Sequence, residues 1–258
     1  MKLASYADGS RDGHLVVVSR DLTQAHYATG IATRLQQVLD DWGFIAPQLE
    51  DLAVQLNHGK LRHAFPFEPE KCVAPLPRAF GWAVVDAEGG VRREAGSFAG
   101  PHQPLRSVAV GEPALAAVAG DLNAACDAGA ALDALRLLML TLDWRLDGEL
   151  ISSQAAPLAI TPDELGPAWS AGRLEARLAL LHNGSRQAAR EVQAAPGAAL
   201  ARVARLRALR AGQAVGVALG ALDLPLAPED SLHLDLKTAD GASLFGAIDI
   251  EIAPAPLP

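Results

Sequence analysis

The chain has 258 residues, of which half are hydrophobic and a fifth are charged, a balance typical of a soluble globular protein. This length suffices for one large domain, or for one large and one small domain. The net charge of −8 argues against a nucleic-acid partner, because phosphate binding needs clustered cations. Residues 1–13 lack an apolar signal segment and no apolar stretch is long enough for a membrane span. We therefore expect a cytoplasmic protein with no membrane contact.

The first part of the chain has the pattern of a small α+β unit. Residues 2–19 predict a β-hairpin around a turn at 7–13, and residues 33–58 predict a helix broken at Gly43 and Pro47. A proline-rich passage at 65–77 follows, which favours an extended connector. We therefore divide the chain into a small N-terminal α+β domain, residues 1–72, and a larger domain, residues 73–258.

The larger domain is predicted to be mostly β. Residues 80–110 hold few apolar blocks, and 86–90 read as a turn. The remaining expected elements are strands at 107–110, 115–118 and 174–182, an amphipathic helix at 198–209, and a closing hairpin formed by 232–236 and 244–252. Pro113 argues against a regular central strand around it, since proline cannot donate to a ladder.

One apolar stretch stands out because it ends in a polar group. Residues 137–142 form a run that fits a central strand or the end of a buried helix, and Asp143 and Trp144 follow directly. A carboxylate at the end of a buried element is within reach of both solvent and a ligand. The alternative is that Asp143 caps the next turn.

Several stretches resemble the fumarylacetoacetate hydrolase family. Residues 15–22, 25–32 and 74–79 resemble the N-terminal domain that precedes the catalytic domain in its bacterial members. The Thr-Pro-Asp-Glu-Leu-Gly turn at 161–166 and the stretch 245–249 resemble two later segments. The resemblance implies an α+β protein: a small α+β N-terminal domain followed by a shortened, mostly β, fumarylacetoacetate hydrolase-like mixed β-roll.

The resemblance also implies a site. Family members cleave a carbon–carbon bond in 1,3-dicarbonyl acids, and a divalent cation held by hard oxygen ligands absorbs the negative charge that forms. The Glu-x-Glu pair of the family corresponds to Glu112 and Ala114, and its later metal-binding Asp corresponds to Asp143. Glu112 and Asp143 are thus the candidate, vestigial metal ligands. The candidate substrate-pocket residues are Trp144, Arg145 and Gly220.

Other parts of the family's machinery have no counterpart, so we assign no catalytic residue. His102 is the only histidine in the segment expected to carry the base, and its context matches no family motif. No lysine occurs between Lys71 and Lys237, and the late substrate-contacting loop is the apolar 218–221. The favoured hypothesis is a catalytically depleted family member, a pseudoenzyme with no cofactor, that serves as a binding or structural subunit.

Two alternatives stay open. The chain is a hydrolase or decarboxylase of small 1,3-dicarbonyl, acylpyruvate-like acids, with Mg²⁺, Ca²⁺ or Mn²⁺ on Glu112 and Asp143, or it is a metal-free binder of a small organic acid. The family resemblance further implies a homodimer, or a mixed dimer with an active relative.

Overall fold

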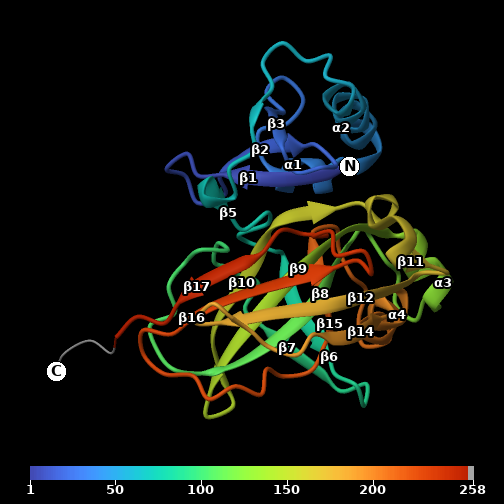
Figure 1. The fold of residues 1–258 in the computed structure, drawn as a ribbon. Helices are drawn as coiled ribbons and strands as arrows, with labels where there is room; N and C mark the ends of the chain where they lie inside the picture. The colour runs from blue at the N-terminus through green and yellow to red at the C-terminus, as the bar shows by residue number, and fades with distance from the viewer. Residues whose placement is uncertain (255–258) are drawn as a thin grey trace.

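The computed structural model describes residues 1–254, which form a small N-terminal unit beside a larger β-rich domain (Figure 1). In the N-terminal unit, two helices cover one face of the strands. Its elements are β1 (Lys2–Tyr6), β2 (His14–Val18), β3 (Gln24–Tyr27), α1 (Leu35–Asp40), α2 (Trp42–Asn57), β4 (Phe65–Pro66), the 3₁₀ turn η1 (Pro69–Lys71) and β5 (Cys72–Val73).

The larger domain is built mainly from long antiparallel strands, as predicted. Its elements are β6 (Gly81–Val85), β7 (Val91–Glu94), β8 (Val110–Ala119), α3 (Ala128–Asp133), β9 (Leu135–Leu146), β10 (Glu149–Ile160), the 3₁₀ turn η2 (Pro162–Ala168), β11 (Trp169–Ser170), β12 (Arg173–His182), β13 (Ser185–Arg186), β14 (Arg190–Ala194), α4 (Pro196–Ala204), β15 (Gln213–Ala218), β16 (Ser231–Lys237) and β17 (Ile248–Glu251). The predicted α+β class with a mostly β second domain is confirmed.

Two sheets organise residues 1–254. The first has eleven strands in the order β4-β3-β2-β1-β10-β9-β8-β15-β6-β7, with β5 pairing to β1. The second has six strands, in the order β11-β12-β16-β17, with β13 and β14 also pairing to β12. The first sheet runs from the N-terminal unit into the larger domain, because Lys2 and Leu3 of β1 pair with Ile160 and Ala159 of β10. The division at residues 72 and 73 remains a prediction.

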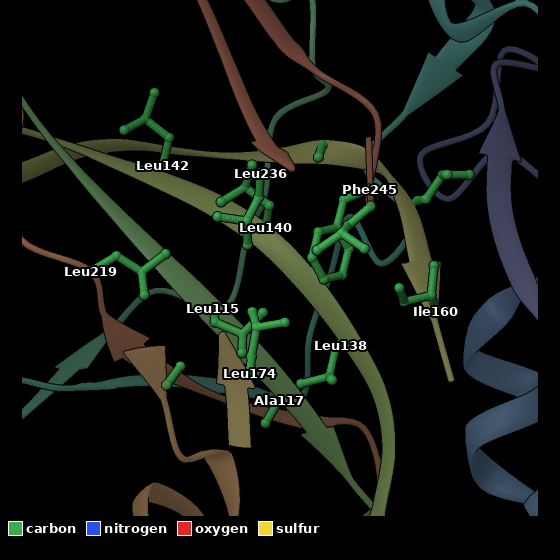
Figure 2. Close-up of a cluster of buried hydrophobic side chains, with 14 of the residues drawn as sticks. Leu115, Ala117, Leu138, Leu140, Leu142, Ile160, Leu174, Leu219, Leu236 and Phe245 are labelled. Carbon is green, nitrogen blue, oxygen red and sulfur yellow. The ribbon is translucent and has the colours of Figure 1, made fainter. Parts of the chain in front are cut away.

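The main core lies between the two sheets (Figure 2). Leu115, Leu138 and Leu140 of the first sheet face Leu174 and Leu236 of the second, and all are buried. Phe245, from the loop before β17, closes this core beside them. A second core covers the opposite face of the first sheet and includes the buried side of α2.

The stretch at 137–147 is a central strand, β9, and its alternation divides the two cores. Leu138, Leu140 and Trp144 point into the core between the sheets, whereas Leu137 and Met139 belong to the second core. A strand that is buried on both faces shows a continuous apolar run, which is why periodicity alone left helix and strand open. Asp143, by its odd number, lies on the face of Leu137 and Met139.

Three local expectations were wrong. The helix at 33–58 breaks at Asp41, which has φ −134° and ψ 54°, and α2 continues through Pro47 in its second turn. Residues 107–109 precede β8 and are not part of it, and α4 ends at Ala204. Leu206, which lies within the expected helix at 198–209, is therefore 59% exposed in the following turn.

The expectation for Pro113 was also wrong, since β8 runs through it without interruption. The Pro113 carbonyl accepts a hydrogen bond from the Leu219 amide at 2.9 Å, on the side of β8 away from β9. The N–H and C=O of one strand residue point to the same side. The N–H that Pro113 lacks would therefore have pointed away from β9, so its absence removes no hydrogen bond from the β8–β9 ladder.

No helix in the described part of the chain is long and apolar enough to cross a membrane.

Candidate functional site

The two candidate metal ligands lie opposite each other on neighbouring strands. Glu112 of β8 pairs in register with Asp143 of β9, and opposite residues of an antiparallel pair share one face of the sheet. Ala114, two residues after Glu112, lies on the same face opposite Thr141 and supplies no oxygen ligand from its side chain. The topology thus brings together the two carboxylates that the resemblance singled out.

Asp143 is held by side chains that already use both of its oxygens. It is 1% exposed. The Ser153 hydroxyl donates to Oδ1 at 2.6 Å and the Trp82 indole donates to Oδ2 at 3.3 Å. Burial raises the pKa of the Asp143 carboxyl to about 6, since desolvation outweighs the two hydrogen bonds that favour the charged form.

Glu112 is paired with two arginines. Its Oε2 accepts from Nη2 of Arg92 at 2.7 Å and from Nε of Arg145 at 2.8 Å. The same Arg145 guanidinium donates through Nη2 to Glu94 and through Nη1 to the Gly148 carbonyl at 3.1 Å. Arg145 is therefore bound by two carboxylates and a backbone carbonyl, all supplied by the chain itself.

A small cavity of about 210 Å³ lies beside these groups. Glu112, Asp143 and Gly220 all line it, together with Arg92, Asp86, Glu88 and the small residues Ala114 and Ala221. Gly220 has φ +86°, a conformation that favours glycine, and its carbonyl accepts from the Arg190 guanidinium at 2.8 Å. Three of the five predicted site residues thus meet at one cavity.

Trp144 and Arg145 lie elsewhere. The Trp144 ring is fully buried on the opposite face of β9, where its indole donates to Oε1 of Gln154 at 2.7 Å. Arg145 lies outside the lining of the cavity and pairs directly with Glu112 and with Glu94 of β7. Neither side chain is presented to the cavity as the resemblance implied.

Sequence reasoning missed four participants: Trp82, Arg92, Glu94 and Ser153. The first three belong to the β6–β7 hairpin, which lies in the stretch judged to hold few apolar blocks. The available signal was the Gly81–Val85 run followed by a Gly89-Gly90 turn. Ser153 was visible only as a polar residue within the long strand that follows β9.

The residues of this site do not fit a divalent cation. Mg²⁺ and Ca²⁺ need several free oxygen ligands that converge on one point. Here Glu112 is paired to two guanidinium groups, both oxygens of Asp143 accept hydrogen bonds, and Ala114 offers no side-chain donor. Within residues 1–254, no group of three or more His, Cys, Asp or Glu side chains is arranged to hold a metal.

No histidine lines this cavity in the described part of the chain. His102 lines a separate cavity of about 610 Å³ with His233, which pairs through Nδ1 with Asp249 at 2.5 Å. A proton acceptor for cleavage chemistry would therefore have to come from Asp143, Glu112 or the more exposed Asp86 and Glu88.

Comparison with known proteins shows which proteins this chain resembles. Residues 1–78 match the family described as fumarylacetoacetase N-terminal domain 2. The sequence matches none of the curated proteins.

Solved structures share the fold over nearly the whole chain. Maleylpyruvate hydrolase from Sphingobium sp. SYK-6 is 16% identical with a TM-score of 0.72, covering 98% of this chain and 99% of that one. Fumarylacetoacetate hydrolase from Exiguobacterium antarcticum is 15% identical with a TM-score of 0.69, covering 98% and 99%. A probable 2-hydroxyhepta-2,4-diene-1,7-dioate isomerase from Mycobacterium abscessus is 16% identical with a TM-score of 0.73, covering 100% and 99%. Residues 1–78 thus match a fumarylacetoacetase N-terminal domain, and the chain shares the fold of these hydrolase and isomerase structures along nearly its whole length.

Proposed function

We propose that this protein is a non-catalytic member of its fold group and acts as a binding or structural subunit. The observation that carries the proposal is the position of Arg145, whose guanidinium is bound by Glu112 and Glu94. The Arg145 guanidinium, which also donates to the Gly148 carbonyl, neutralises the Glu112 carboxylate that a divalent metal would otherwise use. The remaining carboxylate, Asp143, is buried and disfavours the charged form.

The ligand side of the proposal rests on the 210 Å³ cavity. Arg92 lines it with a side chain that is 40% exposed, so a small organic acid has one cationic partner there. Four carboxyl groups, from Asp86, Glu88, Glu112 and Asp143, share the same lining and oppose an anion. The structural role therefore fits this lining better than acid binding, and it includes a homodimer or a mixed dimer with an active relative. The mass of the purified protein by light scattering, alone and with such a relative, tests that part.

A second candidate function has support in the comparisons. One structure that shares this fold, at 16% identity and a TM-score of 0.71, is maleylpyruvate hydrolase from Sphingobium sp. SYK-6 in complex with manganese(II) ion and pyruvate. This chain keeps Glu112 and Asp143 facing each other across β8 and β9. The alternative is thus a Mg²⁺- or Mn²⁺-dependent hydrolase or decarboxylase of small acylpyruvate-like acids.

Metal titration separates the two functions. The wild-type protein is unfolded thermally at rising Mg²⁺ and Mn²⁺ and then assayed for acylpyruvate cleavage. Our proposal expects no metal-dependent rise in Tm and no turnover. An Arg145→Ala variant releases Glu112 and Glu94 and is expected to gain a metal-dependent rise in Tm, whereas Arg92→Ala keeps Arg145 in place and gains none. Metal-dependent turnover by the wild type that Asp143→Asn abolishes would refute the proposal.

A further inference from the structure

A buried lysine lies in a large cleft, away from the Glu112–Asp143 pair. Lys2 of β1 is 4% exposed and lines a cleft of about 850 Å³ with residues of η2 and of the 238–244 loop. The Lys2 Nζ has one weak contact, to the Leu244 carbonyl at 3.5 Å. None of the ion pairs formed within residues 1–254 includes this ammonium group. A lysine this deeply buried is normally paired.

The surroundings of Lys2 lower the pKa of its ammonium group. Burial lowers the pKa of the Lys2 ammonium, Arg20 lowers it further, and Glu164 partly opposes both. Glu164 is itself engaged by Arg20, whose Nε donates to its two carboxyl oxygens at 3.1 and 3.2 Å, and lies 3.3 Å from the Met1 amino group. Its charge is therefore shared among other cations, which leaves Lys2 without a full counter-ion.

The charge of the cleft selects among carbonyl compounds. Beside Lys2 and Arg20, its lining holds five carboxyl groups, from Asp163, Glu164, Glu175, Glu191 and Asp240. This acidic lining repels a carboxylate-bearing ligand and admits an uncharged one. The oxygens of Thr238 and Ser243 line the same space, although each accepts or donates a bond within the protein.

We propose that Lys2 is a carbonyl-capturing amine that forms a reversible imine with small uncharged aldehydes in this cleft. The nitrogen lone pair forms a bond to the carbonyl carbon, and a proton passes from nitrogen to oxygen to give the carbinolamine. The remaining N–H proton then passes to the leaving hydroxyl as the carbon–oxygen bond breaks, which releases water and leaves the C=N bond to Nζ. No electrons are gained or lost, and hydrolysis regenerates both partners.

The test uses the full chain, glycolaldehyde as the probe, and cyanoborohydride to fix the imine. Peptide mass spectrometry then follows the initial labelling rate of Lys2 and of Lys71, with fragment ions separating the Lys2 amine from the Met1 amine. Lys71 is a matched contrast, because its ion pair with Glu68 raises the pKa of its ammonium group. Each pKa unit changes the uncharged fraction at pH 7 about tenfold.

The proposal expects faster labelling of Lys2 than of Lys71 at pH 7, and a fall of this ratio at pH 10, where both amines lose their protons. In the unfolded protein the preference for Lys2 is expected to vanish. A Lys2→Arg variant is expected to retain its fold and to lose only the label at this position. Slower labelling of Lys2 than of Lys71 at pH 7, or a ratio that does not change with pH, would overturn the proposal.

Glyoxylate tests the ligand class, because it has the size of glycolaldehyde and carries a negative charge. With each rate normalised to that of the exposed Lys60, Lys2 is expected to prefer glycolaldehyde to glyoxylate. Equal or greater labelling by glyoxylate contradicts selection by the acidic lining. A Glu164→Gln variant removes the group that favours the ammonium form and is expected to speed labelling at pH 7, and a slower rate in this variant contradicts the assigned charge environment.

Discussion

The raised pKa of the buried Asp143 carboxyl predicts the direction in which the free energy of unfolding changes with pH. Its pKa in the folded protein is about 6, above the ordinary value of 3.8. Between these two pH values the folded state binds more protons than the unfolded state, so the free energy of unfolding falls as pH rises. Below the lower value both states are protonated and the cost is absent, and above pH 6 the full cost is present.

The size of this effect follows from the two pKa values. The gap between 3.8 and about 6, at about 1.4 kcal/mol for each pKa unit, corresponds to about 3 kcal/mol. An Asp143→Asn variant carries no charge at any pH. Its amide accepts from the Trp82 indole and donates to the Ser153 hydroxyl, so both hydrogen bonds of the site retain a partner.

We therefore expect Asp143→Asn to gain stability relative to the wild type as pH rises from 4 to 7, by up to about 3 kcal/mol. Urea unfolding of both proteins across this range measures the difference, and subtraction of the two curves removes the contribution of the other carboxyl groups. Asp240→Asn is the control: the Thr238 hydroxyl lowers the pKa of this exposed carboxyl, so that variant is expected to lose stability relative to the wild type as pH rises.

A difference between Asp143→Asn and wild type that does not change with pH would refute the reasoning. So would a change of opposite sign, which means that a cation stabilises the charged form. Repeating the series in excess Mg²⁺ tests that case directly: a metal on Asp143 would lower its pKa and abolish the slope, whereas our reading of the site expects the same slope with and without the metal.

Two further pairs of variants test the packing of the same strands. Arg145→Gln breaks an ion-pair network whose arginine is 10% exposed, and it is expected to lower the free energy of unfolding by about 3 kcal/mol. Arg92→Gln removes a half-exposed arginine from the same Glu112 and is expected to lower the free energy of unfolding by about 1 kcal/mol or less. Urea unfolding at pH 7 measures both. Leu140→Ala opens a cavity between the two sheets and is expected to lower the free energy of unfolding by about 2 to 5 kcal/mol. Leu206→Ala, in the exposed turn, is expected to change it by no more than about 0.5 kcal/mol. Similar losses in both variants would contradict the core assignment.

The fold was largely predictable because its strongest signals are local. The hairpin at 2–19 has a polar turn between two apolar runs, and β1 and β2 pair there as antiparallel strands. The closing hairpin alternates between apolar and polar residues, and β16 pairs with β17. The alternation in the closing hairpin fixes which side chains face the core, whereas in the first hairpin the polar turn between two apolar runs specifies the elements.

The parts that failed depend on tertiary context. The β6–β7 hairpin has a short apolar run and a charged second strand, and it is stabilised by parallel pairing of β6 with β15, far along the chain. No pattern within the sequence of the β6–β7 hairpin predicts that β6 pairs with β15. The strand through Pro113 likewise depends on where β15 ends, which the sequence around Pro113 does not contain.

The candidate site divides in the same way. The family resemblance assigned Glu112 and Asp143 to positions of metal ligands, and the pairing of β8 with β9 brings them face to face. Their partners come from three other strands: Arg92 from β7, Trp82 from β6 and Ser153 from β10. These contacts set the charge of the site, and none of them follows from spacing within the sequence.

The pairing of Glu112 with Asp143 explains why the rest of the site is arranged as it is. Two carboxylates directly opposite each other repel, so a stable sheet must neutralise at least one of them. One solution is a shared divalent cation. This chain uses two others: Arg145 pairs with Glu112, and burial favours a proton on Asp143. Because Glu112 is already paired with a guanidinium and both oxygens of Asp143 accept hydrogen bonds, a metal ion would have to displace these partners to gain the two ligands.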